Sequence, residues 1–370
     1  MEAHIRSVPC SSQGTATIML HQSSAHGRAF LIIIDRFAYF LRVHHDSMSK
    51  EFSPGFFFRN PHIQTFLGRS KFRLREEETL RQASAPVILD GGNGVRLLGY
   101  HTRQPEGNSR GLIALIHGWE GSADSTYILS TACFFFQRGF DIFRLNLRDH
   151  GESHHLNEGL FHGALILETF TAMQHIARLC RQGHFYIVGF SLGGNYALRL
   201  ALKHNQKDSI PALSHVFAVS PALDPYKSTL AIDQGLAIYR RYFLKKWKRS
   251  LLKKEMLFPD LYDFRAMMKI GTCMELTEAI MPYYPDFSDY RQYFSHYTLT
   301  DEAFSSLSIP ATIMISQDDP VVPIEDFHGL KHQQNLHLSI QRHGGHCGFI
   351  DMPGFSCWYE RKIYDTINAG

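Results

Sequence analysis

The chain of 370 residues lacks the features typical of several protein classes. Its formal net charge of only +3 is far from the strongly basic domain expected of a nucleic-acid-binding protein. Its six cysteines form no C-x-x-C pair and no zinc-type spacing, so we expect no disulfide framework and no metal. The best candidate for a secretory signal, the apolar run Phe30–Ile34, ends at Asp35 and is too short for a signal core or for a membrane span of ~20 residues. We therefore expect a cytoplasmic globular protein that needs no cofactor.

Composition divides the chain into three parts. Residues 1–29 are rich in Ser, His, Gln and Gly and show no apolar period, which predicts disorder. Met48 opens a stretch typical of a natural start, so we interpret 1–47 as an extension and 48–85 as an N-terminal arm. The remainder, 86–370, is long enough to form one large α/β domain.

Regular alternation begins near residue 86. Two strand-like segments flank the turn at 91–94 and predict a hairpin. Apolar strands then alternate with helical segments, which predicts a mostly parallel sheet with helices on both faces. The strands are expected at 112–116, 140–145, 185–188, 216–219, 311–315 and 336–340, and the helices at 124–138, 163–181, 192–204 and 354–368.

The alternation stops at about 224–304. This segment is helical, aromatic and locally basic, and it lies where it would cover the carboxyl ends of the strands, so we interpret it as a helical cap insert. Its cations could give a weak peripheral contact with an anionic membrane, although a solvated face is the simpler interpretation. These cations are Lys245, Lys246, Lys248, Arg249, Lys253 and Lys254.

Ser191 is the candidate nucleophile. It is the centre of Gly189-Phe190-Ser191-Leu192-Gly193, a G-x-S-x-G motif that directly follows a predicted strand and precedes a helix. Such a tight turn needs its glycines for clearance and raises the serine hydroxyl above the sheet. The backbone N–H of Leu192 is then expected to donate to the oxyanion. The second donor is expected from the loop after the strand at 112–116, as the N–H of Trp119.

The partners of such a serine follow it in the order acid, then histidine. Two histidines follow the last strand; His346, deeper in the loop behind glycine, is the expected base, and His343 is the fallback. Two carboxylates follow the strand at 311–315; Asp319, directly before a proline, is the expected acid, and Asp318 is the alternative. The acid would hold the imidazole tautomer and stabilise the imidazolium.

Together, five motifs resemble the α/β-hydrolase superfamily and, within it, the YheT-like or AB hydrolase 4 family. The motifs are Asn60-Pro61-His62-Ile63-Gln64-Thr65, His117-Gly118-Trp119-Glu120-Gly121, Gly189 to Asn195, Asp318-Asp319-Pro320, and Gly344 to Phe349. The resemblance implies the α/β-hydrolase fold, a triad of Ser191, Asp319 and His346, and action on acyl esters, with relatives acting on medium-chain esters or phospholipids. It gives no chemical role to residues 60–65, for which docking of the arm is the simpler interpretation.

A serine nucleophile with a histidine base indicates acyl transfer through an acyl-enzyme. We expect a serine carboxylesterase acting on small-molecule acyl esters, with medium-chain or lipid esters as candidates. An acyltransferase that passes the acyl group to an alcohol would use the same triad. A non-catalytic binding protein of this fold is the third alternative, although such proteins usually lose a triad member.

Overall fold

A computed structural model of the chain describes residues 51–369 apart from 75–76, 106–107, 206 and 352–354. The extension expected at 1–47 lies outside the described residues. The N-terminal arm contains short helices, of which α2 (Pro61–Gly68) is the longest. Asn60 caps α2, because its Oδ1 accepts the N–H groups of His62 at 2.9 Å and Ile63 at 3.2 Å. The other arm helices are η1 (Phe56–Phe58), η2 (Lys71–Arg73) and α3 (Glu77–Gln82).

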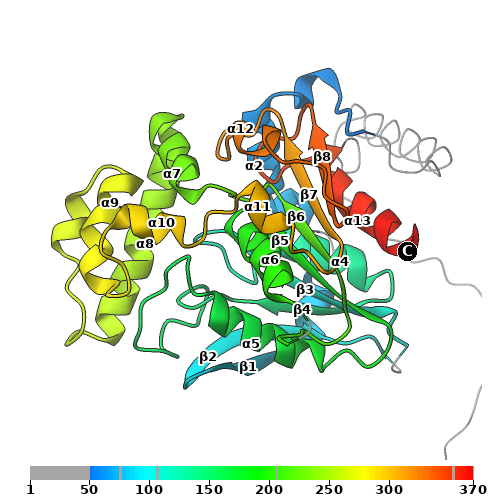
Figure 1. The fold of residues 1–370 in the computed structure, drawn as a ribbon, viewed down its shortest axis with the longest axis horizontal. Coiled ribbons are helices and arrows are strands. Elements are labelled where there is room, and N and C mark those ends of the chain that lie inside the picture. Colours follow the sequence, from blue (N-terminus) through cyan, green and yellow to red (C-terminus); the bar gives the residue numbers. More distant parts are fainter. Residues whose placement is uncertain (1–50, 75–76, 106–107, 206, 352–354, 370) are drawn as a thin grey trace, which may run out of the picture. The chain divides into compact units, whose positions relative to one another are not determined.

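Eight strands form one sheet in the order β1-β2-β4-β3-β5-β6-β7-β8 (Figure 1). β2 runs antiparallel to both its neighbours, β1 and β4, and every other pairing in this sheet is parallel. The expected hairpin and the mostly parallel sheet are therefore confirmed. The strands are β1 (Ser84–Gly92), β2 (Val95–Thr102), β3 (Gly111–Ile116), β4 (Asp141–Leu145), β5 (His184–Phe190), β6 (Leu213–Val219), β7 (Ala311–Ser316) and β8 (Leu336–Gln341), with a separate short pair, β9 (Ile350–Asp351) and β10 (Ser356–Cys357).

Helices cover both faces of the sheet, as the alternation predicts. Successive side chains of a strand point to opposite faces, so alternate residues of β3 enter different cores. Leu112, Ala114 and Ile116 pack with α5 (Ile166–Ala177) and α6 (Leu192–Lys203). Ile113 and Leu115 pack with α4 (Thr126–Phe136) and α13 (Trp358–Ala369). All of β3 is buried, which explains its continuous apolar run.

The segment between β6 and β7 contains helices and no strand (Figure 1). We refer to residues 224–304 as the insert. One of its cations, Lys254, is buried (0% exposed) and donates to Asp149 Oδ1 at 2.8 Å, which ties the insert to the loop after β4. The basic stretch is therefore only partly a solvated face. The insert helices are α7 (Pro225–Gln234), α8 (Ala237–Leu257), η4 (Ala266–Lys269), α9 (Cys273–Ile280), η5 (Met281–Tyr283), α10 (Tyr290–Ser295) and α11 (Asp301–Phe304); α12 (Glu325–His328) follows β7.

Candidate active site

Ser191 stands in the turn between β5 and α6. Its φ of 54° and ψ of −119° are rarely adopted by a residue with a side chain, so the turn holds the serine under strain. The chain is packed too closely here for larger residues. A Cβ on Gly189 would lie 2.0 Å from the carbonyl oxygen of Gly193, and one on Gly193 would lie 2.3 Å from that of Ile116. These glycines are therefore needed for the turn that presents the Ser191 hydroxyl.

The structure brings Ser191, His346 and Asp319 together. His346 Nε2 lies 3.0 Å from Ser191 Oγ, and His346 Nδ1 lies 2.9 Å from Asp319 Oδ2. The side chains of His346 and Asp319 are 2% and 0% exposed. Asp319 Oδ1 also accepts the N–H groups of Val321 at 2.8 Å and Val322 at 2.9 Å. The carboxylate is thus held in place by its own loop, and it orients the imidazole toward the serine.

Two opposing effects act on the pKa of His346. Burial lowers it, because a charged imidazolium is poorly solvated inside the protein. The carboxylate of Asp319 favours the charged form, and the balance raises the pKa of His346 above its ordinary value of 6.5. The same contact would stabilise the imidazolium that forms when His346 accepts a proton from Ser191.

The fallback residues Asp318 and His343 lie together as a second pair. Asp318 Oδ1 accepts the N–H of Gly345 at 2.9 Å, and Asp318 Oδ2 lies 3.4 Å from His343 Nδ1. Among the described residues, neither forms a hydrogen bond with Ser191. Asp318 instead helps to shape the loop that precedes His346.

The loop after β3 lies directly against Ser191. A Cβ on Gly118 would come within 3.0 Å of the Cβ of Ser191, so only glycine allows this approach. In the part of the chain that the structure describes, the N–H groups of Trp119 and Leu192 donate to no protein acceptor. Leu192 is the first residue of α6, where backbone N–H groups are unpaired and the helix dipole favours negative charge. Both expected donors are therefore available to an oxyanion.

Three side chains that were not expected to contact this loop hold it in place. Tyr127 OH accepts the N–H of Gly118 at 2.9 Å, and His150 Nε2 accepts the N–H of Glu120 at 3.2 Å. From the insert, Lys246 Nζ donates to the carbonyl oxygen of Glu120 at 2.8 Å. Glu120 itself has a φ of 54°. These bonds engage the N–H groups on either side of Trp119.

The motif at 60–65 has a role that the sequence did not reveal. Thr65 Oγ1 accepts the backbone N–H of His346 at 2.9 Å. Gln64 Oε1 accepts the N–H of Ile350 at 2.7 Å, and its Nε2 donates to the carbonyl oxygen of Ile350 at 3.1 Å. Helix α2 therefore fixes the loop that carries the histidine, in addition to docking the arm.

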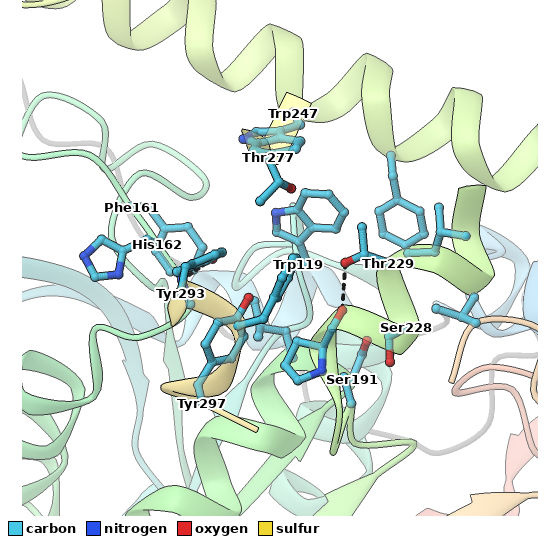
Figure 2. A pocket seen from close by; sticks show the side chains of 18 of the residues that line it. Trp119, Phe161, His162, Ser191, Ser228, Thr229, Trp247, Thr277, Tyr293 and Tyr297 are labelled. Atoms are coloured by element: carbon cyan, nitrogen blue, oxygen red, sulfur yellow. Dashed lines mark hydrogen bonds between the residues drawn. The ribbon is translucent and has the colours of Figure 1, made fainter. Parts of the chain in front are cut away.

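A cavity of about 740 Å³, including its part open to solvent, starts at Ser191 and is shared by the core loops and the insert. Figure 2 shows Trp247 on the far side of this cavity from Ser191, with Trp119 between them. The Trp119 ring stacks on Phe243 at 5.3 Å and meets Trp247 edge-on at 5.0 Å. The insert supplies most of the aromatic wall, through Phe243, Trp247, Tyr284, Tyr293, Phe294 and Tyr297.

A smaller cavity of about 340 Å³ also borders Ser191. It shares Ser191, Trp119 and Phe243 with the larger one, but it alone of the two is lined by His346. Its remaining lining comes from Gly68, Arg69, Gly118, Tyr127 and Cys347. Ser191 therefore borders both the larger, mainly apolar cavity and the smaller cavity that His346 lines.

The described part of the chain has neither a metal-binding group of side chains nor a membrane-spanning helix. No group of three His, Cys, Asp or Glu side chains there is arranged to hold a metal ion. None of its helices combines the length and the apolar character needed to cross a bilayer.

Comparison with known families gives a match that covers most of the sheet and the insert. The family described as "alpha/beta hydrolase fold" matches residues 111–353. Among curated proteins, YheT of Escherichia coli (strain K12) is 25% identical over 339 residues, which cover 87% of this chain and 94% of that protein. Human "Phospholipase ABHD3" is 23% identical over 276 residues, covering 71% of this chain and 65% of that protein. The zebrafish (Danio rerio) "Monoacylglycerol lipase ABHD2" is 26% identical over 219 residues, covering 54% and 51%.

Solved structures give the same fold. An esterase of Pyrococcus furiosus superimposes with a TM-score of 0.51 at 14% sequence identity, covering 77% of this chain and 90% of that one. A Staphylococcus aureus protein of unknown function also reaches 0.51, at 15% identity, covering 77% and 98%. At these identities the likeness concerns the fold alone.

Proposed function

Since this chain belongs to the α/β-hydrolase fold family, we propose that it is a serine carboxylesterase that hydrolyses acyl esters through an acyl-enzyme. The observation that carries the proposal is the 3.0 Å contact between Ser191 Oγ and His346 Nε2, with Asp319 behind the imidazole. In this proposal Ser191 is the nucleophile, His346 the base and Asp319 the acid. The relationship to YheT and to the ABHD proteins agrees with the YheT-like family expected from the motifs.

The geometry supports a two-step reaction. Ser191 Oγ attacks the ester carbonyl carbon while His346 Nε2 takes its proton, and the N–H groups of Leu192 and Trp119 stabilise the oxyanion. The tetrahedral intermediate collapses, the bond to the alcohol oxygen breaks, and His346 returns the proton to that oxygen. A water molecule, deprotonated by His346, then attacks the acyl-enzyme and releases the carboxylic acid and Ser191.

Proton transfer assigns the two cavities to the two parts of the ester. The alcohol oxygen must lie next to His346 Nε2 when it receives the proton, because proton transfer needs hydrogen-bond contact. Of the two cavities, the smaller is the one lined by His346, so it holds the alcohol. The larger cavity, whose lining is mainly apolar, then holds the acyl chain.

The apolar wall of the larger cavity favours esters with an aliphatic acyl chain of medium length, or lipid esters. Burying each methylene contributes about 0.8 kcal/mol, so a longer chain gains affinity until the cavity is full. Two of the relatives are named as a phospholipase and a monoacylglycerol lipase, which supports lipid esters as a substrate class.

A series of p-nitrophenyl esters, from acetate to palmitate, tests the proposal on wild type and on Ser191→Ala. We expect wild type to hydrolyse the series and the variant to lose several orders of magnitude in kcat, on the order of 10⁶ as for other triad enzymes. Ser228→Ala is the matched control, because Ser228 lines the same cavity as Ser191 but does not belong to the triad. Added glycerol measures how much acyl group passes to an alcohol instead of water. Equal activity of wild type and Ser191→Ala would refute the proposal.

A further inference from the structure

Arg69 lies in the smaller cavity, beside the catalytic base. It directly follows α2 and lines this cavity together with Ser191 and His346. Its guanidinium carbon lies 4.6 Å from the ring centre of Tyr242 and 5.6 Å from that of Phe243, both on α8. The guanidinium is therefore held between the arm and the insert, at the wall of the cavity assigned to the alcohol.

The charge of Arg69 is not neutralised by a carboxylate of the protein. Among the described residues, no Asp or Glu forms an ion pair with Arg69, and its side chain donates no hydrogen bond. Two buried arginines differ from the half-buried Arg69: Arg73 lies 3.7 Å from a carboxylate oxygen of Glu360, and Arg144 lies 3.0 Å from one of Asp124. The two aromatic rings beside the guanidinium do not neutralise its charge, so its N–H groups stay available to an anion.

The position of Arg69 is coupled to that of the base. A Cβ on Gly68 would lie 2.9 Å from the carbonyl oxygen of Cys347, so the end of α2 is pressed against the loop that carries His346. One turn earlier, Thr65 accepts the N–H of His346. The end of α2, which leads into Arg69, is thus fixed against the loop of His346.

We propose that Arg69 binds an anionic group, a phosphate or a carboxylate, on the alcohol part of the ester. The guanidinium presents a planar fork of N–H donors that matches the oxygens of both groups. The proposal rests on the proposed function, because it uses the assignment of the smaller cavity to the alcohol. It makes Arg69 a specificity-determining residue of that reaction, while the acyl chain is selected separately by the aromatic wall of the insert.

The test compares esters that share one acyl chain and differ in the alcohol. Decanoyl glycerol is neutral, decanoyl glycerol phosphate carries a phosphate, and decanoyl glycolate carries a carboxylate. We expect wild type to hydrolyse at least one anionic ester with a higher kcat/KM than the neutral one. Arg69→Met should lower kcat/KM for that ester roughly 10- to 100-fold more than for decanoyl glycerol, because hydrogen bonds to charged groups are the strong ones. Which anionic ester responds identifies phosphate or carboxylate as the ligand.

Two controls distinguish anion binding by Arg69 from a general or structural effect. Arg241→Met removes an exposed cation of α8 that lines neither cavity, so it should leave all three rates unchanged. Inhibition of p-nitrophenyl decanoate hydrolysis by free glycerol phosphate, weakened by Arg69→Met, would show anion binding without relying on turnover. An equal loss on neutral and anionic esters in Arg69→Met would overturn the proposal and indicate a structural role. Absence of turnover of every ester, including p-nitrophenyl decanoate, would instead refute the proposed esterase function.

Discussion

The two sides of Ser191 are built from different kinds of interaction. On the side of His346, hydrogen bonds accepted by Thr65, Asp318 and Asp319 fix the histidine and its loop. On the opposite side, aromatic side chains of the insert pack against Trp119 to enclose the larger cavity. Directional bonds suit a group that must meet the serine at 3.0 Å, whereas packed rings suit a wall that only has to fit an apolar chain.

This difference predicts a separation of effects. Changes on the His346 side should alter turnover by the same factor for every acyl chain, because each ester uses the same proton transfers. Changes in the insert should alter the chain-length preference and leave short esters alone. A variant that mixes the two effects would show that the sides are coupled.

The largest effect is expected from Asp319→Asn. The amide can no longer stabilise the imidazolium and can hold His346 in the wrong tautomer, so kcat should fall by about 10⁴. The fall in kcat should be equal for p-nitrophenyl butyrate and p-nitrophenyl decanoate. Asp318→Asn is the matched control, because its oxygen can still accept the N–H of Gly345 and it lies outside the triad contacts. Comparable losses in both variants would contradict Asp319 as the acid.

The pH profile should change nearly as strongly. His346 must be neutral to accept the serine proton, and Asp319 raises the pKa of His346 above 6.5. We therefore expect kcat/KM to fall tenfold for each pH unit below a midpoint that lies above pH 6.5. In Asp319→Asn, the carboxylate no longer favours the charged imidazolium while burial still lowers the pKa of His346, so the midpoint should move to lower pH. A profile that is flat from pH 6 to 9 would contradict His346 as the base.

Thr65→Val tests the contribution of α2 to the histidine loop. The variant leaves the buried N–H of His346 without its acceptor, which costs about 1 kcal/mol and should lower kcat roughly fivefold. Thr65→Ser keeps the hydroxyl and should restore the rate. The loss should be in kcat and independent of acyl chain. A change in KM for long chains only would place Thr65 on the acyl side.

The sequence predicts those parts of the molecule whose causes are local. The apolar run at 112–116 corresponds to β3, and the glycines around Ser191 correspond to a turn where any Cβ would clash. The helix expected at 163–181 is shorter, since α5 spans Ile166–Ala177. Gly163 lies in the loop before α5, where its N–H donates to Tyr293 OH of the insert, a contact that no local pattern contains.

Residues that act across long sequence distances were not predictable. Thr65 and His346 are 281 positions apart, and their bond appears only when α2 docks on the loop after β8. Tyr127 and His150 hold the loop of Trp119 in the same way, from separate elements. Arg69 belongs to none of the sequence motifs. Its environment depends on two rings of α8 and on the absence of a carboxylate partner among the described residues.

The smallest effect, and the one most specific to the insert, is expected from Thr277→Leu. Figure 2 places Thr277 beside Trp247, on the side of the larger cavity away from Ser191. A leucine there would fill the distal end, so each methylene that no longer fits should cost about 0.8 kcal/mol, or roughly fourfold in kcat/KM. Long-chain esters should lose activity in this way, and p-nitrophenyl butyrate should be unaffected. Thr366→Leu on α13 is the matched control: both threonine hydroxyls donate to the carbonyl four residues earlier, but Thr366 lines neither cavity. An equal loss on butyrate and decanoate in Thr277→Leu would show that the insert also sets the geometry of the triad.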